Sequence, residues 1–164
     1  MKKVKRILAL SLSAALLLAL LCACGSTGDK NPDIDLNALW DKIAALGEMP
    51  GFMDTPEEML SGDGFGIDPA DLEAYISKTP MMNVQATEFF IAKVKDGKMD
   101  TVKAALESRQ ASLDAQWATY LPDQHDLVKN YKLTTNGSYI FFAISEYAEQ
   151  AEKLFNDTIA EAKS

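Results

Sequence analysis

The chain has 164 residues, 24 acidic and 16 basic side chains, and a formal net charge of −8. This length fits one domain with its own hydrophobic core. The acidic balance argues against nucleic acid as a partner, because such surfaces need clustered Lys and Arg. The two cysteines, Cys22 and Cys24, both lie near the N-terminus. They leave the rest of the chain without a disulfide, a CxxC redox pair or a thiolate nucleophile.

The first 23 residues have the three parts of a secretory signal peptide. Residues 1–6 carry four cations and no acid, residues 7–23 form an uncharged apolar run, and small residues precede Cys24. The run of 17 residues is at the short limit for a helix that crosses a bilayer. An uncleaved membrane anchor is therefore the alternative interpretation.

The end of the apolar run, Leu21-Cys22-Ala23-Cys24, resembles the lipobox of bacterial lipoproteins. The resemblance implies thioether attachment of a diacylglycerol to Cys24, with palmitate as an expected acyl group, and cleavage before this residue. Other small residues are commoner than cysteine at the position of Cys22. Because two acyl chains anchor a protein stably, we expect a chain held on the extracytoplasmic face of the cell membrane. Cleavage removes four cations and no acid, which moves the formal charge from −8 to −12.

Residues 24–34 contain the lipidated cysteine and a polar stretch with Gly, Ser and Pro, which predicts a flexible tether. A single domain is then expected from 35 to 164. Its first helix is predicted at 36–46, with Asp35 as N-cap and Gly47 at its end, because apolar side chains recur there at helical spacing. A loop-rich stretch follows, in which residues 55–58 have the pattern of a capping box.

The remaining chain alternates between strand and helix patterns. Strands are predicted around 72–78 and 88–95, and a long helix at about 99–120 that restarts after Pro122. Asn136-Gly137 separates two β-prone runs and predicts a hairpin with a type I′ turn. Ser145 is expected to cap a last helix at 146–162. The fold class predicted is α+β: an antiparallel sheet of about four strands in β-β-α-β-β-α order, with helices packed on one face and an N-terminal helix before it.

Four sequence features stand out from residue 66 onward: Gly66-Ile67-Asp68, the segment from Pro80-Met81 to Glu88, the Lys93–Gly97 end of a strand, and Gly137-x-Tyr139. Together they resemble the bacterial domain of unknown function 4358 (DUF4358). Such domains typically follow lipoprotein signals, mostly in Gram-positive bacteria. The family has no assigned activity, so the resemblance implies a fold and a location and brings no catalytic residues.

The sequence offers little for catalysis or metal binding. His125 is the single histidine, and a Ser-His-Asp triad would have to use it. Its setting in Asp-Gln-His-Asp after a proline favours a surface histidine instead. Asp63, Asp68 and Asp71 supply oxygen ligands of the kind calcium prefers, but they do not have EF-hand spacing. We expect no catalytic residue, no metal site and no cofactor.

The candidate binding surface is aromatic. Phe89 and Phe141 each belong to a pair of adjacent phenylalanines in a strand, so each pair places one ring on each face of the sheet. If helices cover one face only, Phe89 and Phe141 are exposed and mark a binding surface together with Met53. A sheet covered on both faces is the alternative. Arg109 lies in the apolar stripe of the long helix and is either buried or extends to the edge of the core.

These features favour a lipid-anchored, non-enzymatic domain that binds a partner at the cell envelope, either another envelope protein or a wall component. A small cell-surface hydrolase that uses His125 is one alternative. The other is a solute-binding lipoprotein, for which the chain is short, so that a ligand would need a pocket within one domain.

Overall fold

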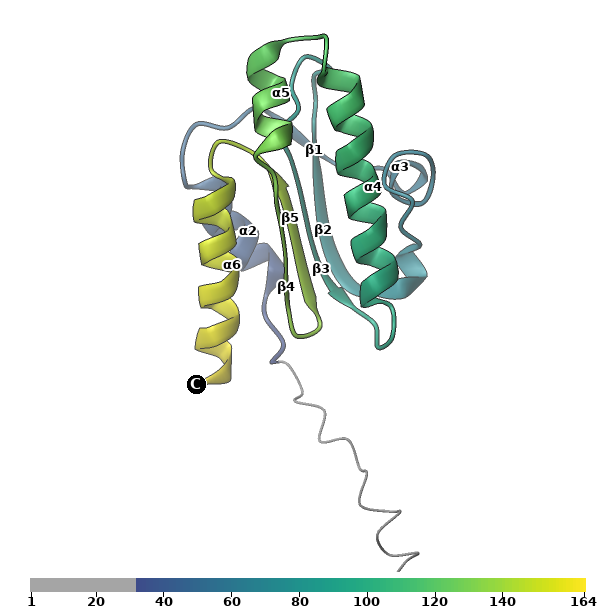
Figure 1. Cartoon of the computed structure of the whole chain (residues 1–164). Coiled ribbons are helices and arrows are strands. Elements are labelled where there is room, and N and C mark those ends of the chain that lie inside the picture. Colours follow the sequence, from purple (N-terminus) through teal and green to yellow (C-terminus); the bar gives the residue numbers. More distant parts are fainter. Residues whose placement is uncertain (1–31) are drawn as a thin grey trace, which may run out of the picture. The chain divides into compact units, whose positions relative to one another are not determined.

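The computed structural model describes residues 32–164, so the predicted signal peptide and Cys24 lie outside the described residues. Residues 31–164 form one compact unit that contains both hydrophobic clusters of the domain. The helices are α2 (Leu36–Ala44), α3 (Glu57–Ser61), α4 (Met99–Trp117), α5 (Pro122–Lys129) and α6 (Ala148–Lys163), with a 3-10 turn η1 (Pro69–Asp71) (Figure 1). The strands are β1 (Phe52–Asp54), β2 (Leu72–Pro80), β3 (Glu88–Val94), β4 (Lys132–Asn136) and β5 (Tyr139–Ile144).

The five strands form one antiparallel sheet in the order β1-β2-β3-β5-β4. The α+β class and the antiparallel pairing are confirmed, but the sheet has one strand more than the four or so predicted. The additional strand is β1, which pairs with the end of β2 through Phe52 opposite Pro80. A strand of three residues is too short to display a two-residue alternation, so the sequence favours a loop there.

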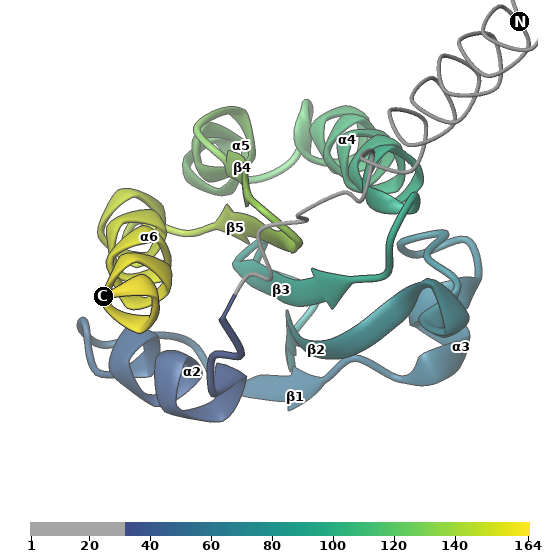
Figure 2. The same ribbon diagram turned by 90° about the horizontal axis from the view of Figure 1, so that it is seen from below.

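Helices cover both faces of the sheet, and the prediction of one covered face is wrong (Figure 2). On one face α4 and α5 pack against a cluster that includes Phe90 and Phe142. On the other face α2 and α6 pack against a cluster that includes Phe89 and Phe141. Every residue of β5 is buried, which is what a strand covered on both sides requires.

The N-terminal end of α2 forms as the sequence predicts. The side chain of Asp35 accepts hydrogen bonds from the backbone N–H groups of Asn37 and Ala38, at 2.9 and 3.1 Å. The last helix begins at Ala148, two residues later than predicted. Ser145 still shapes this start, because its hydroxyl accepts a hydrogen bond from the N–H of Tyr147 at 3.1 Å.

The hairpin between β4 and β5 is confirmed, but its turn differs from the predicted type. Asn136 pairs with Tyr139, so the two turn residues are Gly137 and Ser138. In the described residues only Leu121, Gly66, Gly97 and Gly137 have positive φ, and the value at Gly137 is 61°. Positive φ at the first turn residue alone is the pattern of a type II′ turn, which places glycine there.

Candidate functional site

Two of the three predicted surface residues are buried. Phe89 and Phe141 have no exposed area, so they cannot form a binding surface. The reason is the second helical layer: Phe89 packs edge-on against Trp40 of α2 at 5.4 Å between ring centroids, and Phe141 stacks on Phe155 of α6 at 5.3 Å. Met53 on the edge strand β1 is exposed, as predicted. The predicted lipidation site, Cys24, lies outside the described residues.

The polar residues considered for chemistry have structural partners. His125 Nε2 lies 2.7 Å from Asp114 Oδ1, and no serine, threonine or cysteine in the described part of the chain hydrogen-bonds to this ring. Asp68 caps η1 by accepting from the N–H of Ala70, and Asp71 pairs with Lys98 at 2.8 Å. Residues 32–164 contain no group of three His, Cys, Asp or Glu side chains that could hold a metal ion.

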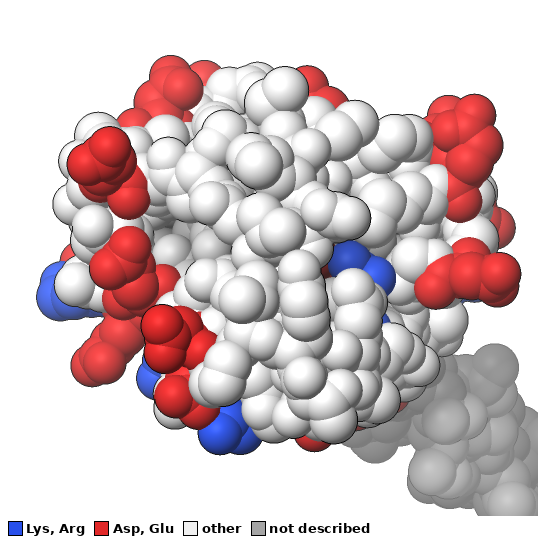
Figure 3. All heavy atoms as spheres, turned by 90° about the horizontal axis from the view of Figure 1, so that it is seen from above, with Lys and Arg blue, Asp and Glu red and all other residues white. Residues whose placement is uncertain are grey.

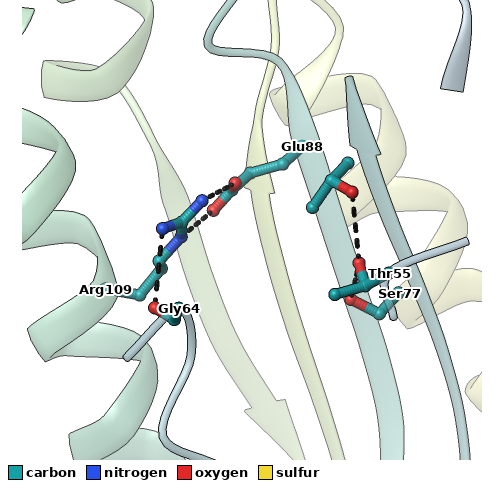
Figure 4. A network of polar contacts seen from close by, with 6 residues as sticks. Thr55, Gly64, Ser77, Glu88 and Arg109 are labelled. Atoms are coloured by element: carbon teal, nitrogen blue, oxygen red, sulfur yellow. Dashed lines mark hydrogen bonds and ion pairs between the residues drawn. The ribbon is translucent and has the colours of Figure 1, made fainter. Parts of the chain in front are cut away.

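A largely buried, bidentate ion pair joins α4 to β3. Arg109 donates two hydrogen bonds to Glu88, from Nη2 to Oε2 at 2.7 Å and from Nε to Oε1 at 3.0 Å (Figure 4). Its Nη1 lies 3.5 Å from the carbonyl oxygen of Gly64, and its guanidinium covers the ring of Phe65 at 4.9 Å. Arg109 is therefore largely buried, with 13% of its side-chain area exposed. It holds the loop after α3 against the helix and the sheet.

Burial controls the ionisation of Glu88, whose side chain is only 2% exposed. Loss of hydration raises the pKa of this carboxyl above its ordinary value, and the hydrogen bonds and charge of Arg109 oppose that effect. A bidentate pair that also fixes a loop is a structural link. It offers no open position for a substrate.

A second polar network lies in the same region, between β1 and β2 (Figure 4). Ser77 donates to the hydroxyl of Thr55 at 2.7 Å, and the Thr55 hydroxyl lies 3.5 Å from that of Thr79. The predicted capping box at 55–58 is wrong, because the Thr55 side chain makes no cap hydrogen bond and points into the sheet. These buried hydroxyls satisfy one another.

Among the described residues, six of the seven large exposed apolar side chains, all except Tyr75, gather at one end of the domain, which we call the distal end. It consists of residues 45–53, 80–87, 114–127 and 144–150, where strands and helices end away from Pro32. These segments meet: Met81 N–H donates to the carbonyl of Gly51 at 3.0 Å, and Ala86 N–H donates to the side chain of Gln124 at 2.9 Å.

At the distal end Met81, Met82 and Tyr120 are 67%, 60% and 52% exposed, and Val84 and Leu121 are also exposed. Figure 3 shows a broad white area over the middle of this end, with mostly acidic side chains along its margin and a few basic ones at the lower left edge and in a hollow to the right of the middle. Leu121 has φ of 43°, a left-handed conformation that a leucine rarely adopts. Of this surface, only Met53 was predicted from the sequence, although a turn that contains Met81-Met82-x-Val84 is unusually apolar for a loop.

A cleft of about 210 Å³ opens beside the apolar area. It is lined by residues from the loop before β1, the start of β3, the first turn of α5 and the segment before α6: Met49, Pro50, Thr87, Asp123, Gln124, Leu127, Ser145, Glu146 and Tyr147. Pockets for small solutes usually hold about 300–1,000 Å³. The cleft is small by that standard, which disfavours a solute-binding role.

Negative charge predominates at the distal end. Its four segments contain no lysine or arginine, and their acidic side chains are Glu48, Asp114, Asp123, Asp126, Glu146 and Glu149. Lys129, just beyond these segments, pairs with Asp126 at 2.6 Å. The chain enters the domain at the other end, where Tyr139 Oη donates to the carbonyl of Pro32 and accepts from the N–H of Ile34, both at 3.1 Å. Residues 32–34, the last of the predicted tether, are thus bound to the domain.

No helix within residues 32–164 is both long and apolar enough to cross a membrane. Comparison with known proteins finds one family. A domain of unknown function (DUF4358) matches residues 53–145, which include α4, α5, the strands β2 to β5 and all of β1 except its first residue. No curated protein and no solved structure matches the chain. Since the matched residues make up more than half of the sequence, the chain belongs to the DUF4358 family.

Proposed function

We propose that the chain is a lipoprotein on the extracytoplasmic face of the cell membrane, anchored by a diacylglyceryl group on Cys24, whose domain binds an envelope protein through its distal end. The observation that carries the proposal is the position of the apolar surface. Exposed apolar side chains gather at the distal end, while the chain enters the domain beside Tyr139.

The two ends are separated by the length of β5. This strand runs from Tyr139 to Ile144, and its six residues extend about 17 Å at the usual rise. A domain tethered at its Pro32 end can present the distal end to a neighbour. A contiguous exposed apolar area is typical of a protein interaction site, and methionine side chains adapt to the shape of a partner.

The anchor is tested by Cys24→Ala. We expect the chain with Cys24 to incorporate labelled palmitate and to fractionate with membranes. The Cys24→Ala variant should lose the label and keep its signal peptide uncleaved. A variant that still carries the label, or that matures to the same size, would exclude Cys24 as the lipidation site.

The binding role is tested by a photoreactive amino acid placed in the lipidated protein in living cells. At position 82 we expect a discrete cross-linked protein that disappears when Leu121 is changed to Asp. At position 96, which is exposed but lies outside the distal end, we expect none. Equal cross-linking from both positions would contradict a specific surface, and cross-linking to wall material would assign the partner to that class.

A further inference from the structure

We infer that the partner of the distal end is a basic amphipathic protein segment, with an apolar face for the methionine-rich area and lysine or arginine side chains for its acidic margin. The inference rests on the proposed function, because it specifies the partner of the same surface. It follows from the charge of the distal end, the shape of the cleft and the conformation of Leu121.

Charge selects the kind of partner. The four segments of the distal end carry six acidic side chains and no lysine or arginine. This excess of negative charge attracts a cationic surface and repels an anionic one. A second copy of the chain would bring two acidic margins together, and like charges across an interface oppose association. The same repulsion disfavours nucleic acid and anionic lipid headgroups.

The cleft supplies a place for one basic side chain. Asp123 and Glu146 face it from α5 and from the segment before α6. Its 210 Å³ corresponds to about seven liquid water molecules, which is room for the side chain of one lysine or arginine. Thr87, Gln124 and Ser145 line the same cleft and offer neutral oxygen acceptors.

The apolar area of the distal end would contact the apolar face of the partner segment. Met82 and Tyr120 are both more than half exposed. The flexible methionine and the amphipathic tyrosine can both pack against the apolar face of a helix. Leu121 is held in its left-handed conformation just before Pro122, with its side chain exposed. Backbone strain of this kind concentrates at ligand-contacting positions. The pattern matches a helix laid on an apolar surface with charges at its edges.

The test uses residues 31–164, which contain both hydrophobic clusters of the domain in full. Three synthetic peptides of about 18 residues, or five helical turns, are titrated against it: an amphipathic Leu/Lys helix, a Leu/Glu helix of the same pattern, and a Ser/Lys peptide without the apolar face. We expect the Leu/Lys peptide to bind at least about tenfold more tightly than either of the others.

Two variants of equal net charge separate a specific surface from general attraction to an acidic protein. Glu48, Asp123 and Glu146 are changed to Lys in one, and Asp63, Asp96 and Glu161, which are exposed elsewhere, in the other. We expect the first triple variant to lose at least about tenfold in affinity for the Leu/Lys peptide and the second to lose much less. The single substitution Met82→Ser, at an exposed position, should weaken binding without affecting the fold.

Several results would overturn the inference. Equal losses of affinity in the two triple variants would mean that the peptide responds only to the net charge of the domain. If the Leu/Glu peptide bound as tightly as the Leu/Lys peptide, the partner would not need to be basic. Concentration-dependent dimers of residues 31–164 that Met82→Ser abolishes would make a second copy the occupant. If no peptide binds while position 82 still cross-links specifically in cells, the proposed function stands and the basic partner is wrong. If that cross-link is also missing, the proposed function fails with it.

Discussion

Arg109 and Glu88 form a bidentate ion pair, with N–O distances of 2.7 and 3.0 Å, between the middle of α4 and the first residue of β3. The pair is enclosed by the loop that contains Gly64 and Phe65. Enclosed pairs of this type are costly to break, because removing one partner leaves the other charged and without hydration.

Arg109→Met should therefore destabilise the domain by about 3–5 kcal/mol, measured by urea unfolding. Replacing both partners, as Arg109→Met with Glu88→Leu, should restore most of that loss, because no charge remains buried. Lys103→Met is the control on the same helix. Lys103 pairs with Glu107 at 4.0 Å on an exposed surface, and its loss should cost less than about 1 kcal/mol. Equal losses at Arg109 and Lys103 would contradict the assignment.

The free energy of unfolding should depend on pH in part through the titration of Glu88. Burial raises the pKa of its carboxyl in the folded state above the ordinary 4.5, so the folded state holds this proton to higher pH than the unfolded state does. Its contribution to stability is therefore complete below about pH 4.5 and is lost as the pH rises through the folded-state pKa. Glu88→Gln cannot titrate, so the difference in unfolding free energy between the natural chain and this variant should fall with rising pH. A difference that grows with pH would mean that Arg109 lowers the pKa.

The fold was largely predictable because its signals are local. Asp35 caps the first helix, glycine marks the hairpin at residue 137, and the buried stripe Ala148, Ala151, Phe155 and Ile159 has helical spacing in the sequence. Which faces of the sheet are covered is not local. Adjacent phenylalanines at 89–90 and 141–142 show that both faces are apolar, but they do not tell whether a helix or solvent lies over each.

Apart from Met53, the candidate site could not be predicted from the sequence for a related reason. Its apolar side chains come from the turn at 81–84 and the helix connection at 120–121, which are far apart in the sequence. Each turn by itself reads as an irregular segment, and the chain topology brings them to one end. The absence of lysine and arginine from these four segments becomes evident in the sequence only once the segments are known to lie together.

Substitutions at Thr55 can show whether its side chain caps α3 or hydrogen-bonds to Ser77 of β2. Thr55→Val removes the acceptor of the Ser77 hydroxyl, which is buried, so we expect a loss of about 1–3 kcal/mol in urea unfolding. Adding Ser77→Ala removes the hydroxyl that is left without an acceptor and should recover part of the lost stability. If Thr55 capped α3, Ser77→Ala would recover nothing.

The hydroxyl of Tyr139 holds the N-terminal segment to the sheet. Tyr139→Phe removes the hydrogen bonds to the Pro32 carbonyl and from the Ile34 N–H, each worth about 0.5–1.5 kcal/mol. We expect faster hydrogen exchange at the Ile34 amide. Exchange at Ala92, which is buried in β3, should change only by the loss of global stability. Unchanged exchange at Ile34 would show that Lys93, which binds Asp33 at 2.6 Å, holds the segment instead.

Leu121 is the position where stability and the proposed binding should separate. A left-handed conformation costs a residue with a side chain about 1–2 kcal/mol, while glycine adopts it freely and adds about 0.5–1 kcal/mol of unfolded-state entropy. Leu121 is 39% exposed at φ 43°, so Leu121→Gly should stabilise the domain slightly in thermal and urea unfolding.

Tyr120→Gly is the matched control, because Tyr120 is adjacent and exposed but does not have positive φ. It should destabilise the domain by at least about 0.5–1 kcal/mol, since glycine relieves no strain there and the ring contact of Tyr120 with Trp117 is lost. Equal destabilisation by both changes would mean that packing of the Leu121 side chain outweighs the strain. If Leu121→Gly stabilises the domain while it weakens binding of the Leu/Lys peptide, the leucine is retained for contact with a partner at the expense of stability.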